Sequence, residues 1–350
     1  MVSYFDWQRI AQGEKFISRG DTAHLLATQI REKRFTTIYA APGSGKKSLV
    51  ERALHTLKSA SYPMKVITLD LFNVTSAEML CNMYLNAFSK PIEEYNRDAL
   101  FPIQISSESI STSMAINLPN ILSGYTGANY VVYFKEFQNI LNFEDGDMLL
   151  KLMEREMAGH QVAYIVTGEQ VNAMKEIFER QKYFHLTNCN IPVAPLSKRE
   201  SMLYLRNGFL HSGKDMEEET GEALYRTSKG NPLIMNILAA TCDSLAIGYI
   251  NKRILRSAVD SYFYDHEAIY RYTVSNLTQN QMNFLRAVCD GVAKFSSSEV
   301  LAKYNLNSSA NVFRLKEALS KKEIVTFDSE DKASLIDPMF EQWLKKRYFV

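Results

Sequence analysis

Short apolar runs alternate with stretches of helical period over the first half of the chain. The apolar runs cover residues 36–41, 65–72, 130–134, 162–168 and 190–194. Between them, apolar side chains recur every three to four residues in 46–59, 76–89, 147–158 and 172–181, which is the spacing of one helix face. Continuous apolar strands separated by helices indicate a parallel sheet that is buried on both faces. The pattern therefore predicts an α/β domain over residues 1–196.

Strand patterns stop after residue 196, and the next part of the chain predicts a helical domain. Helical period covers 198–211, 217–228, 232–247 and 251–276, so we assign residues 197–275 to this domain. One segment before it fits neither pattern. Residues 93–129 are rich in Ser, Pro and Asn, and we expect an insertion or mobile loop there rather than a core element.

The last part of the chain, residues 276–350, reads as a separate module. Three helices are expected at 277–290, 297–304 and 308–322, the first opened by Thr278 and the third by Ser308 or Ser309. Two short strands follow at 324–328 and 332–336, around a turn at 329–331, and a terminal amphipathic helix covers 339–348. Three helices followed by a hairpin predict a winged helix.

Composition narrows the class of protein without pointing to any chemistry. The chain has 350 residues, with 40 Lys and Arg against 39 Asp and Glu, so its net charge of +1 gives no general attraction to nucleic acid or to a membrane. The apolar runs are too short to span a bilayer, and the first residues lack a signal-peptide pattern. We therefore expect a cytoplasmic protein with no membrane partner. The four cysteines are scattered and predict buried thiols rather than disulfides or zinc ligands.

The most informative segment follows the first apolar run. It reads Pro42-Gly-Ser-Gly-Lys46 and is continued by Lys47 and Ser48 at the start of a helix. Glycines let several backbone N–H groups converge on one anion, the positive end of the helix dipole lies behind them, and the lysine reaches the β and γ phosphates. The usual pattern is G-x-x-x-x-G-K-[ST]. Here Ala40 takes the first glycine position and Lys47 takes the Ser/Thr position.

A second phosphate-chemistry signal lies at the end of the run 130–134. A carboxylate at the carboxyl end of an apolar strand is the Walker B arrangement, in which an acidic pair supports Mg²⁺ and orients the attacking water. Only the second acid, Glu136, is present, because Lys135 stands at the position of the first.

Together these segments resemble the prokaryotic STAND/AAA+ P-loop ATPases of the archaeal-ATPase type, with degenerate Walker A and Walker B motifs. Further matching motifs lie outside the two Walker segments: Phe16-Ile-Ser-Arg19, Gly230-Asn-Pro232, Leu277-Thr-x-x-Gln281 and Ile336-Asp-Pro-x-Phe-x-x-Trp-Leu344. The resemblance implies a P-loop nucleotide-binding domain, a helical lid and a C-terminal winged helix. It also implies ATP or ADP as ligand and a switch in which lid and winged helix respond to the nucleotide.

Two lysines stand where this family has its magnesium-binding residues. Lys47 replaces the hydroxyl and Lys135 the first carboxylate, and an ammonium group has donors but no acceptor, so it cannot coordinate a cation. We expect magnesium binding to be lost and hydrolysis to be weak or absent. Nucleotide binding remains chemically reasonable because Lys46, Lys47 and Lys135 would supply positive charge without a metal.

Three alternatives stay open at this point. The first is a slow but genuine ATPase that uses Glu136 as its catalytic base. The second is an empty phosphate site in which Lys135 pairs with Glu136 or a nearby acid. The third is a regulator that places 308–322 in a DNA groove, although residues 276–350 carry 11 basic and 9 acidic side chains, a small excess for a DNA reader. A protein partner or self-association fits this module better.

Overall fold

The computed structural model describes residues 4–97, 99, 103, 110–159 and 161–350. The chain divides into two compact units. The first comprises Met1–Arg19, Ala41–Gly45 and Ala194–Val350, and the second comprises Gly20–Ala40 and Lys46–Val193. None of the described helices is both long enough and apolar enough to cross a membrane.

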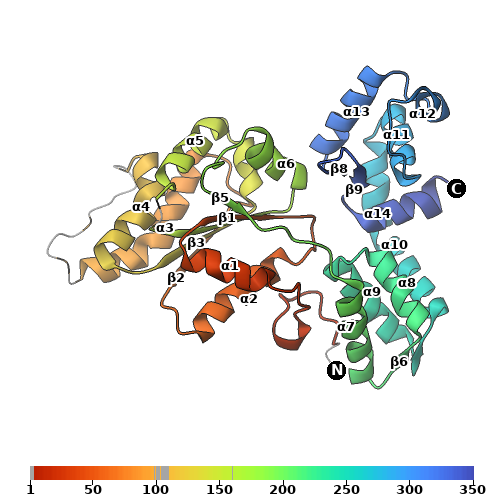
Figure 1. Ribbon diagram of the computed structural model, residues 1–350, viewed down its shortest axis with the longest axis horizontal. Coiled ribbons are helices and arrows are strands. Elements are labelled where there is room, and N and C mark those ends of the chain that lie inside the picture. The colour runs from red at the N-terminus through yellow and green to blue at the C-terminus, as the bar shows by residue number, and fades with distance from the viewer. Residues whose placement is uncertain (1–3, 98, 100–102, 104–109, 160) are drawn as a thin grey trace. The chain divides into compact units, whose positions relative to one another are not determined.

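The second unit is built on a five-stranded parallel sheet with the strand order β2-β3-β4-β1-β5 (Figure 1). Its strands are β1 (Phe35–Tyr39), β2 (Lys65–Asp70), β3 (Tyr130–Lys135), β4 (Ala163–Gly168) and β5 (Asn188–Asn190). The predicted α/β class is therefore confirmed. The last strand begins two residues earlier than the apolar pattern predicts.

The strand order decides which residues meet at the carboxyl edge of the sheet. Strand β4 lies between β1 and β3, and in this register Tyr39 is opposite Gly168 and Phe134 opposite Val166. On the other side of β3, Lys135 is opposite Asp70. The residues that follow β1, β3 and β4 are thus brought together although they are far apart in the sequence.

Helices cover both faces of this sheet, as Figure 1 shows. Strand residues such as Val132, Phe134 and Tyr164 pack with the helices α3 to α5 in one apolar cluster. The intervening Val131, Tyr133 and Ile165 are also buried, because successive side chains of a strand point to opposite faces. The elements of this unit are α1 (Thr22–Arg31), α2 (Lys46–Ser59), α3 (Ala77–Asn96), α4 (Thr112–Thr126), the 3₁₀ helix η2 (Phe137–Asn142), α5 (Gly146–Glu156), α6 (Val171–Lys175) and the π-helix η3 (Glu176–Arg180).

The expectation of a loop over residues 93–129 is wrong for its described parts. Helix α3 continues to Asn96, and α4 occupies most of the second half, where Ile116, Leu118 and Leu122 are fully buried. The Ser111 hydroxyl accepts a hydrogen bond from Met114 N, and Gly127 ends the helix at φ 66°. Burial against α3 and α5 outweighs the low helix propensity of this Ser-, Pro- and Asn-rich sequence. Residues 98, 100–102 and 104–109 of the segment lie outside the described chain.

The first unit begins with a helical part whose predicted helices are all present. They are α7 (Lys198–His211), α8 (Glu218–Ser228), α9 (Pro232–Leu245) and α10 (Lys252–Ser275). The side chains of Ser197, Asn231 and Asn251 accept backbone N–H groups at three of the helix starts, which explains why the boundaries could be read from the sequence. A two-residue parallel pair joins β6 (Asp215–Met216) to β7 (Tyr249–Ile250), which the apolar pattern does not predict.

The predicted winged helix is confirmed at the end of this unit. Its elements are α11 (Gln279–Cys289), α12 (Ser298–Lys303), α13 (Ser309–Lys321), β8 (Val325–Phe327), β9 (Ala333–Leu335), α14 (Pro338–Trp343) and the π-helix η4 (Leu344–Tyr348). Strands β8 and β9 are antiparallel. Thr278 and Gln281 form a capping box at the start of α11, in which the side chain of each residue accepts a hydrogen bond from the backbone N–H of the other.

A segment before the first strand also belongs to this unit. Phe5 is 1% exposed, and its ring lies 4.8 Å from that of Phe209 and 5.8 Å from that of Tyr204, both on α7. Gly208 makes room for it, because a Cβ there would lie 2.3 Å from Phe5 Cζ. The short 3₁₀ helix η1 (Gly13–Lys15) follows.

We expect Gly208→Ala to destabilise the protein although alanine is the better helix former. The added methyl group must displace Phe5 from a filled site, which costs about 1–3 kcal/mol. Denaturant unfolding followed by circular dichroism measures the change. Gly124→Ala in α4 is the matched control, because its Cβ meets nothing within 4 Å, and we expect it to be neutral or to stabilise by about 0.5–1 kcal/mol. Equal midpoints for the two variants would contradict this account.

Candidate nucleotide-binding site

The phosphate loop predicted at Pro42–Lys46 has a backbone that only glycine adopts easily. Gly43 has φ 72° and Gly45 has φ 88°, both in the left-handed region. Between them, Ser44 N donates to Ala41 O at 3.2 Å. Helix α2 begins at Lys46, directly after the second glycine.

Within the first unit, the loop is held by the Gly230-Asn-Pro232 step. Asn231 Nδ2 donates to Pro42 O at 3.0 Å, and Leu233 N donates to Gly43 O at 3.3 Å. The contact is close, since a Cβ on Gly43 would lie 2.6 Å from Leu233 Cβ. The same asparagine caps α9 through Oδ1, so the start of this helix and the loop share one side chain.

Arg19 is a second support of the loop that the sequence singled out only as part of a motif. Its Nε donates to Ala194 O at 2.9 Å, and its Nη2 donates to Ser44 O. A Cβ on Gly45 would lie 3.2 Å from Nη1. Burial lowers the pKa of the Arg19 guanidinium to about 10, so this group still carries its charge at neutral pH.

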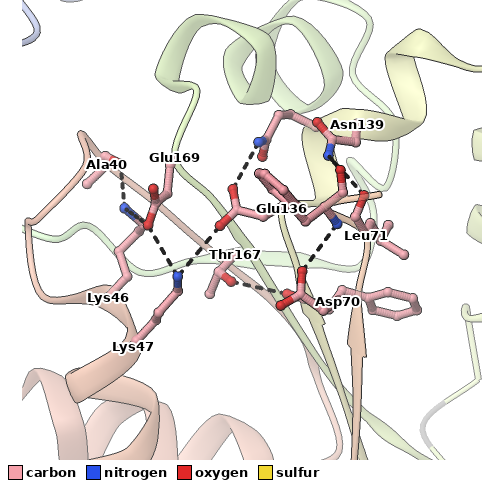
Figure 2. Close-up of polar contacts among 12 residues, drawn as sticks. Ala40, Lys46, Lys47, Asp70, Leu71, Glu136, Asn139, Thr167 and Glu169 are labelled. Atoms are coloured by element: carbon pink, nitrogen blue, oxygen red, sulfur yellow. Dashed lines mark hydrogen bonds and ion pairs between the residues drawn. The ribbon is translucent and has the colours of Figure 1, made fainter. Parts of the chain in front are cut away.

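In the second unit, two lysines and two carboxylates form the centre of the candidate site (Figure 2). Lys46 Nζ donates to Ala40 O at 2.8 Å and lies 4.0 Å from Glu169 Oε1. Lys47 Nζ lies 3.6 Å from Glu169 Oε1 and 3.8 Å from Glu136 Oε1. The Lys47 ammonium therefore lies between the two carboxylates. Lys46 is 3% exposed and Lys47 is exposed.

Burial makes Lys46 an unusual lysine. Desolvation lowers the pKa of its ammonium to about 8, against the opposing effect of the carboxylates of Glu169 and Glu136. Lys47 adds to the lowering because a second positive charge disfavours the charged form. The protonation state of Lys46 is therefore set first by its burial and then by the charges of its neighbours.

Glu136, the candidate catalytic residue, is already engaged through both carboxylate oxygens. It adopts φ 52° just before η2, and its Oε2 accepts from Gln138 Nε2 at 3.1 Å while Oε1 faces Lys47. Gln138 is 4% exposed, and its Oε1 has no hydrogen-bond partner among the described residues. Gln138 is not among the site residues predicted from the sequence, although it lies two positions after Glu136.

Lys135, another predicted binding residue, contacts an aromatic ring rather than a carboxylate of the cluster. Its Nζ lies 5.5 Å from the centre of the Tyr133 ring, in a cation–π arrangement. The ammonium that pairs with Glu136 is that of Lys47 and not that of Lys135. Ser48 is half-buried in the first turn of α2, and Pro42 is exposed.

The two positions that the sequence predicts for magnesium binding carry lysines. Magnesium prefers oxygen ligands in octahedral geometry, whereas Lys47 and Lys135 present ammonium groups with no acceptor. In the described part of the chain, no group of three or more His, Cys, Asp and Glu side chains is arranged to hold a metal ion.

On the winged helix, several polar residues of 308–322, the segment considered for DNA binding, make contacts within the module itself. Lys316 pairs with Asp331 and lies over the rings of Phe295 and Phe327. The side chains of Asn311 and Lys322 donate to backbone carbonyls within the same unit. Arg314 and Lys321 on α13 are exposed.

Comparisons with known proteins agree with this architecture. A family model described as "Probable winged helix domain" matches residues 268–346. Among solved structures, a Walker-type ATPase of Pyrococcus abyssi matches with a TM-score of 0.69 and 18% identity, over 97% of this chain and 99% of that one. The ORC2 protein of Aeropyrum pernix in ADPNP-ADP complexes matches with a TM-score of 0.60 and 14% identity, over 97% and 95%. Cdc6p of Pyrobaculum aerophilum matches with a TM-score of 0.51 and 10% identity, over 98% and 96%. A search of curated proteins finds no match.

These similarities establish the fold. The chain has the AAA+ P-loop ATPase fold with a C-terminal winged helix, as the resemblance in the sequence predicts. Assignment to the STAND group and the loss of Walker chemistry remain predictions.

We expect Lys46 to release its proton near pH 8 in the ligand-free protein, whereas an ordinary lysine does so near pH 10.4. The charged form is present below that pH and is lost as pH rises through it, so phosphate affinity should fall between about pH 7 and 9. Lysine ¹³Cε shifts, assigned with Lys46→Arg, measure the midpoint. A midpoint above pH 10 would show that the ammonium is not desolvated.

Proposed function

We propose that this protein binds ATP or ADP in its P-loop without a divalent metal ion, and that hydrolysis is weak or lost. The observation that carries the proposal is the Lys47 ammonium between the carboxylates of Glu136 and Glu169. A metal ion would need those oxygens or the space beside them. A tethered cation already neutralises them.

Charge makes displacement of this lysine by magnesium unfavourable. A divalent ion about 4 Å from an ammonium is repelled by several kcal/mol in a partly dry site. Lys47 cannot offset this repulsion, because it has no lone pair to donate once it is protonated. The same positive charge favours the anionic phosphates.

The phosphate-binding residues follow from the loop and the first turn of α2. We propose that backbone N–H groups of Gly43, Ser44, Gly45 and Lys46 face the phosphates, with Lys46 and Lys47 as the cations. Pro42 shapes the turn, Ser48 lies in the first helical turn, and Lys135 adds long-range positive charge. The positive end of the α2 dipole supports the same anion.

Residual ATPase activity through Glu136 is the enzymatic alternative. A water-orienting carboxylate needs a free oxygen at the attacking water. In the ligand-free protein, Lys47 and Gln138 engage the two oxygens of Glu136. We therefore expect turnover to be slow at best.

The ligands of a solved structure with a similar fold support a nucleotide as the ligand of the P-loop site. The ORC2 structure is of ADPNP-ADP complexes, and we propose the same ligand class here.

On this reading the three parts, residues 1–196, 197–275 and 276–350, form a nucleotide domain, a lid and a winged helix. They act as a nucleotide-dependent or vestigial switch toward a protein partner or a second copy, and the protein works in the cytoplasm. We rank a DNA target lower because Asn311, Lys316 and Lys322 are engaged within their own unit.

We expect neither ADP nor ATP to bind more tightly in excess Mg²⁺ than in EDTA when the affinities are measured by calorimetry, because Mg²⁺ on the free nucleotide competes with Lys46 and Lys47 for the phosphates. The double variant Lys47→Thr/Lys135→Asp restores a hydroxyl and a carboxylate, so its affinity should rise at least tenfold when Mg²⁺ is added. Lys58→Thr makes the same Lys-to-Thr exchange as Lys47→Thr at an exposed position of α2 and should behave as the unmodified protein.

Two results would defeat the proposal. One is at least tenfold tighter binding by the unmodified protein when Mg²⁺ is added. The other is phosphate release that is fast and is abolished by Glu136→Gln, which would establish the enzymatic alternative. Lys46→Met tests the site itself, because loss of this cation should weaken binding at least tenfold with or without metal.

A further inference from the structure

We infer that Glu169 is a specificity-determining residue whose carboxylate takes the place of a terminal phosphate beside Lys46 and Lys47, so that the site prefers nucleoside diphosphates to triphosphates. This inference rests on the nucleotide binding proposed above. It adds a residue that lies outside both Walker segments.

The register of the sheet places Glu169 beside Lys46 and Lys47. Gly168, the last residue of β4, is opposite Tyr39, the last residue of β1. The next residues are therefore neighbours: Ala40, whose carbonyl accepts from Lys46, and Glu169, whose carboxylate faces the same ammonium. A carboxylate at this position meets the phosphate-binding lysine because β4 is adjacent to β1.

Glu169 forms ion pairs with both lysines, whereas Glu136 forms an ion pair with Lys47. The single oxygen Oε1 of Glu169 lies 4.0 Å from Lys46 Nζ and 3.6 Å from Lys47 Nζ (Figure 2). That is the arrangement expected of a phosphate oxygen between two cations. An anion from this chain thus already occupies the region between the two ammonium groups.

The backbone before Glu169 is held in place. Thr167 Oγ1 donates to Phe134 O at 3.1 Å on the neighbouring strand. A Cβ on Gly168 would lie 2.4 Å from Met174 Sδ and 2.6 Å from Gln138 Oε1, so the chain is closely packed here. Glu169 itself is one-third exposed. The carboxylate can rotate on its side chain, but its point of attachment stays beside the lysines.

Charge repulsion then separates the two nucleotides. The lysine of a P-loop reaches the β and γ phosphates. A diphosphate presents its terminal group to Lys46 and leaves the carboxylate in contact with Lys47. A triphosphate brings one more anionic group into the region that Glu169 occupies, so it must displace the carboxylate or accept like-charge contact.

The test compares ADP and ATP affinities in EDTA for the full chain and its variants. We expect the unmodified protein to bind ADP at least tenfold more tightly than ATP. Glu169→Gln keeps the size of the side chain and removes its charge, so ATP affinity should rise at least tenfold while ADP affinity changes less than threefold. Glu169→Ala should give the same pattern. Circular dichroism melting checks that each variant is folded.

The matched control is Glu176→Gln, which removes the same charge at the start of η3. Glu176 pairs with Arg180 at 3.2 Å and forms no ion pair with Lys46 or Lys47 in the described structure. This control should keep the preference for ADP. Inorganic pyrophosphate and tripolyphosphate, measured in parallel, should show the same ranking, because the discrimination acts on the phosphates alone.

The possible failures are distinguishable. If ADP and ATP bind but Glu169→Gln leaves their ratio unchanged, the inference is wrong and the proposed function stands. An equal change in Glu176→Gln would also overturn it, because a general charge effect would then suffice. If no nucleotide binds to any variant, the proposed function fails and this inference falls with it.

Discussion

The ion cluster of Lys46, Lys47, Glu136 and Glu169 is the interaction on which the chemistry of this protein depends. It places a protein cation between two carboxylates, in a fold that elsewhere supports ATPases of the Walker type. The members depend on one another: without Lys47, Glu136 has no ion pair among the described residues, and without Glu169 the buried Lys46 loses its neighbouring carboxylate. The cluster therefore links three properties that we propose for this protein, namely metal independence, weak hydrolysis and a preference for diphosphates over triphosphates.

The strand order makes this cluster possible. Because β4 lies between β1 and β3, the residues after three strands converge on one edge of the sheet. A parallel sheet brings all carboxyl ends to the same side, and ligands in such sheets bind there. The arrangement leaves one buried polar atom unsatisfied. The Gln138 side chain donates to Glu136 through Nε2, but its Oε1 is buried and has no hydrogen-bond partner among the described residues.

A second constraint acts on the phosphate loop through backbone hydrogen bonds in the first unit. Asn231, Leu233 and Arg19 engage three consecutive carbonyls, those of Pro42, Gly43 and Ser44. Because these carbonyls are engaged, the backbone N–H groups of the loop are the groups that we propose face a phosphate. The glycines at 43 and 45 are required by the backbone angles and by the close approach of Leu233 and Arg19.

Local sequence determined most of the secondary structure, because helix caps such as Ser197 and Asn231 and the buried apolar strands act within a few residues. It also supplied the identity of the loop, of Glu136 and of the two lysines at the magnesium positions. The tertiary structure alone decided that α4 forms, since its stability comes from packing against α3 and α5. It also decided which ion pairs form: Glu136 pairs with Lys47 and not with its neighbour Lys135, and Glu169 faces Lys46 only because of the strand order. Those contacts join residues that are far apart in the chain, so no local sequence pattern predicts them.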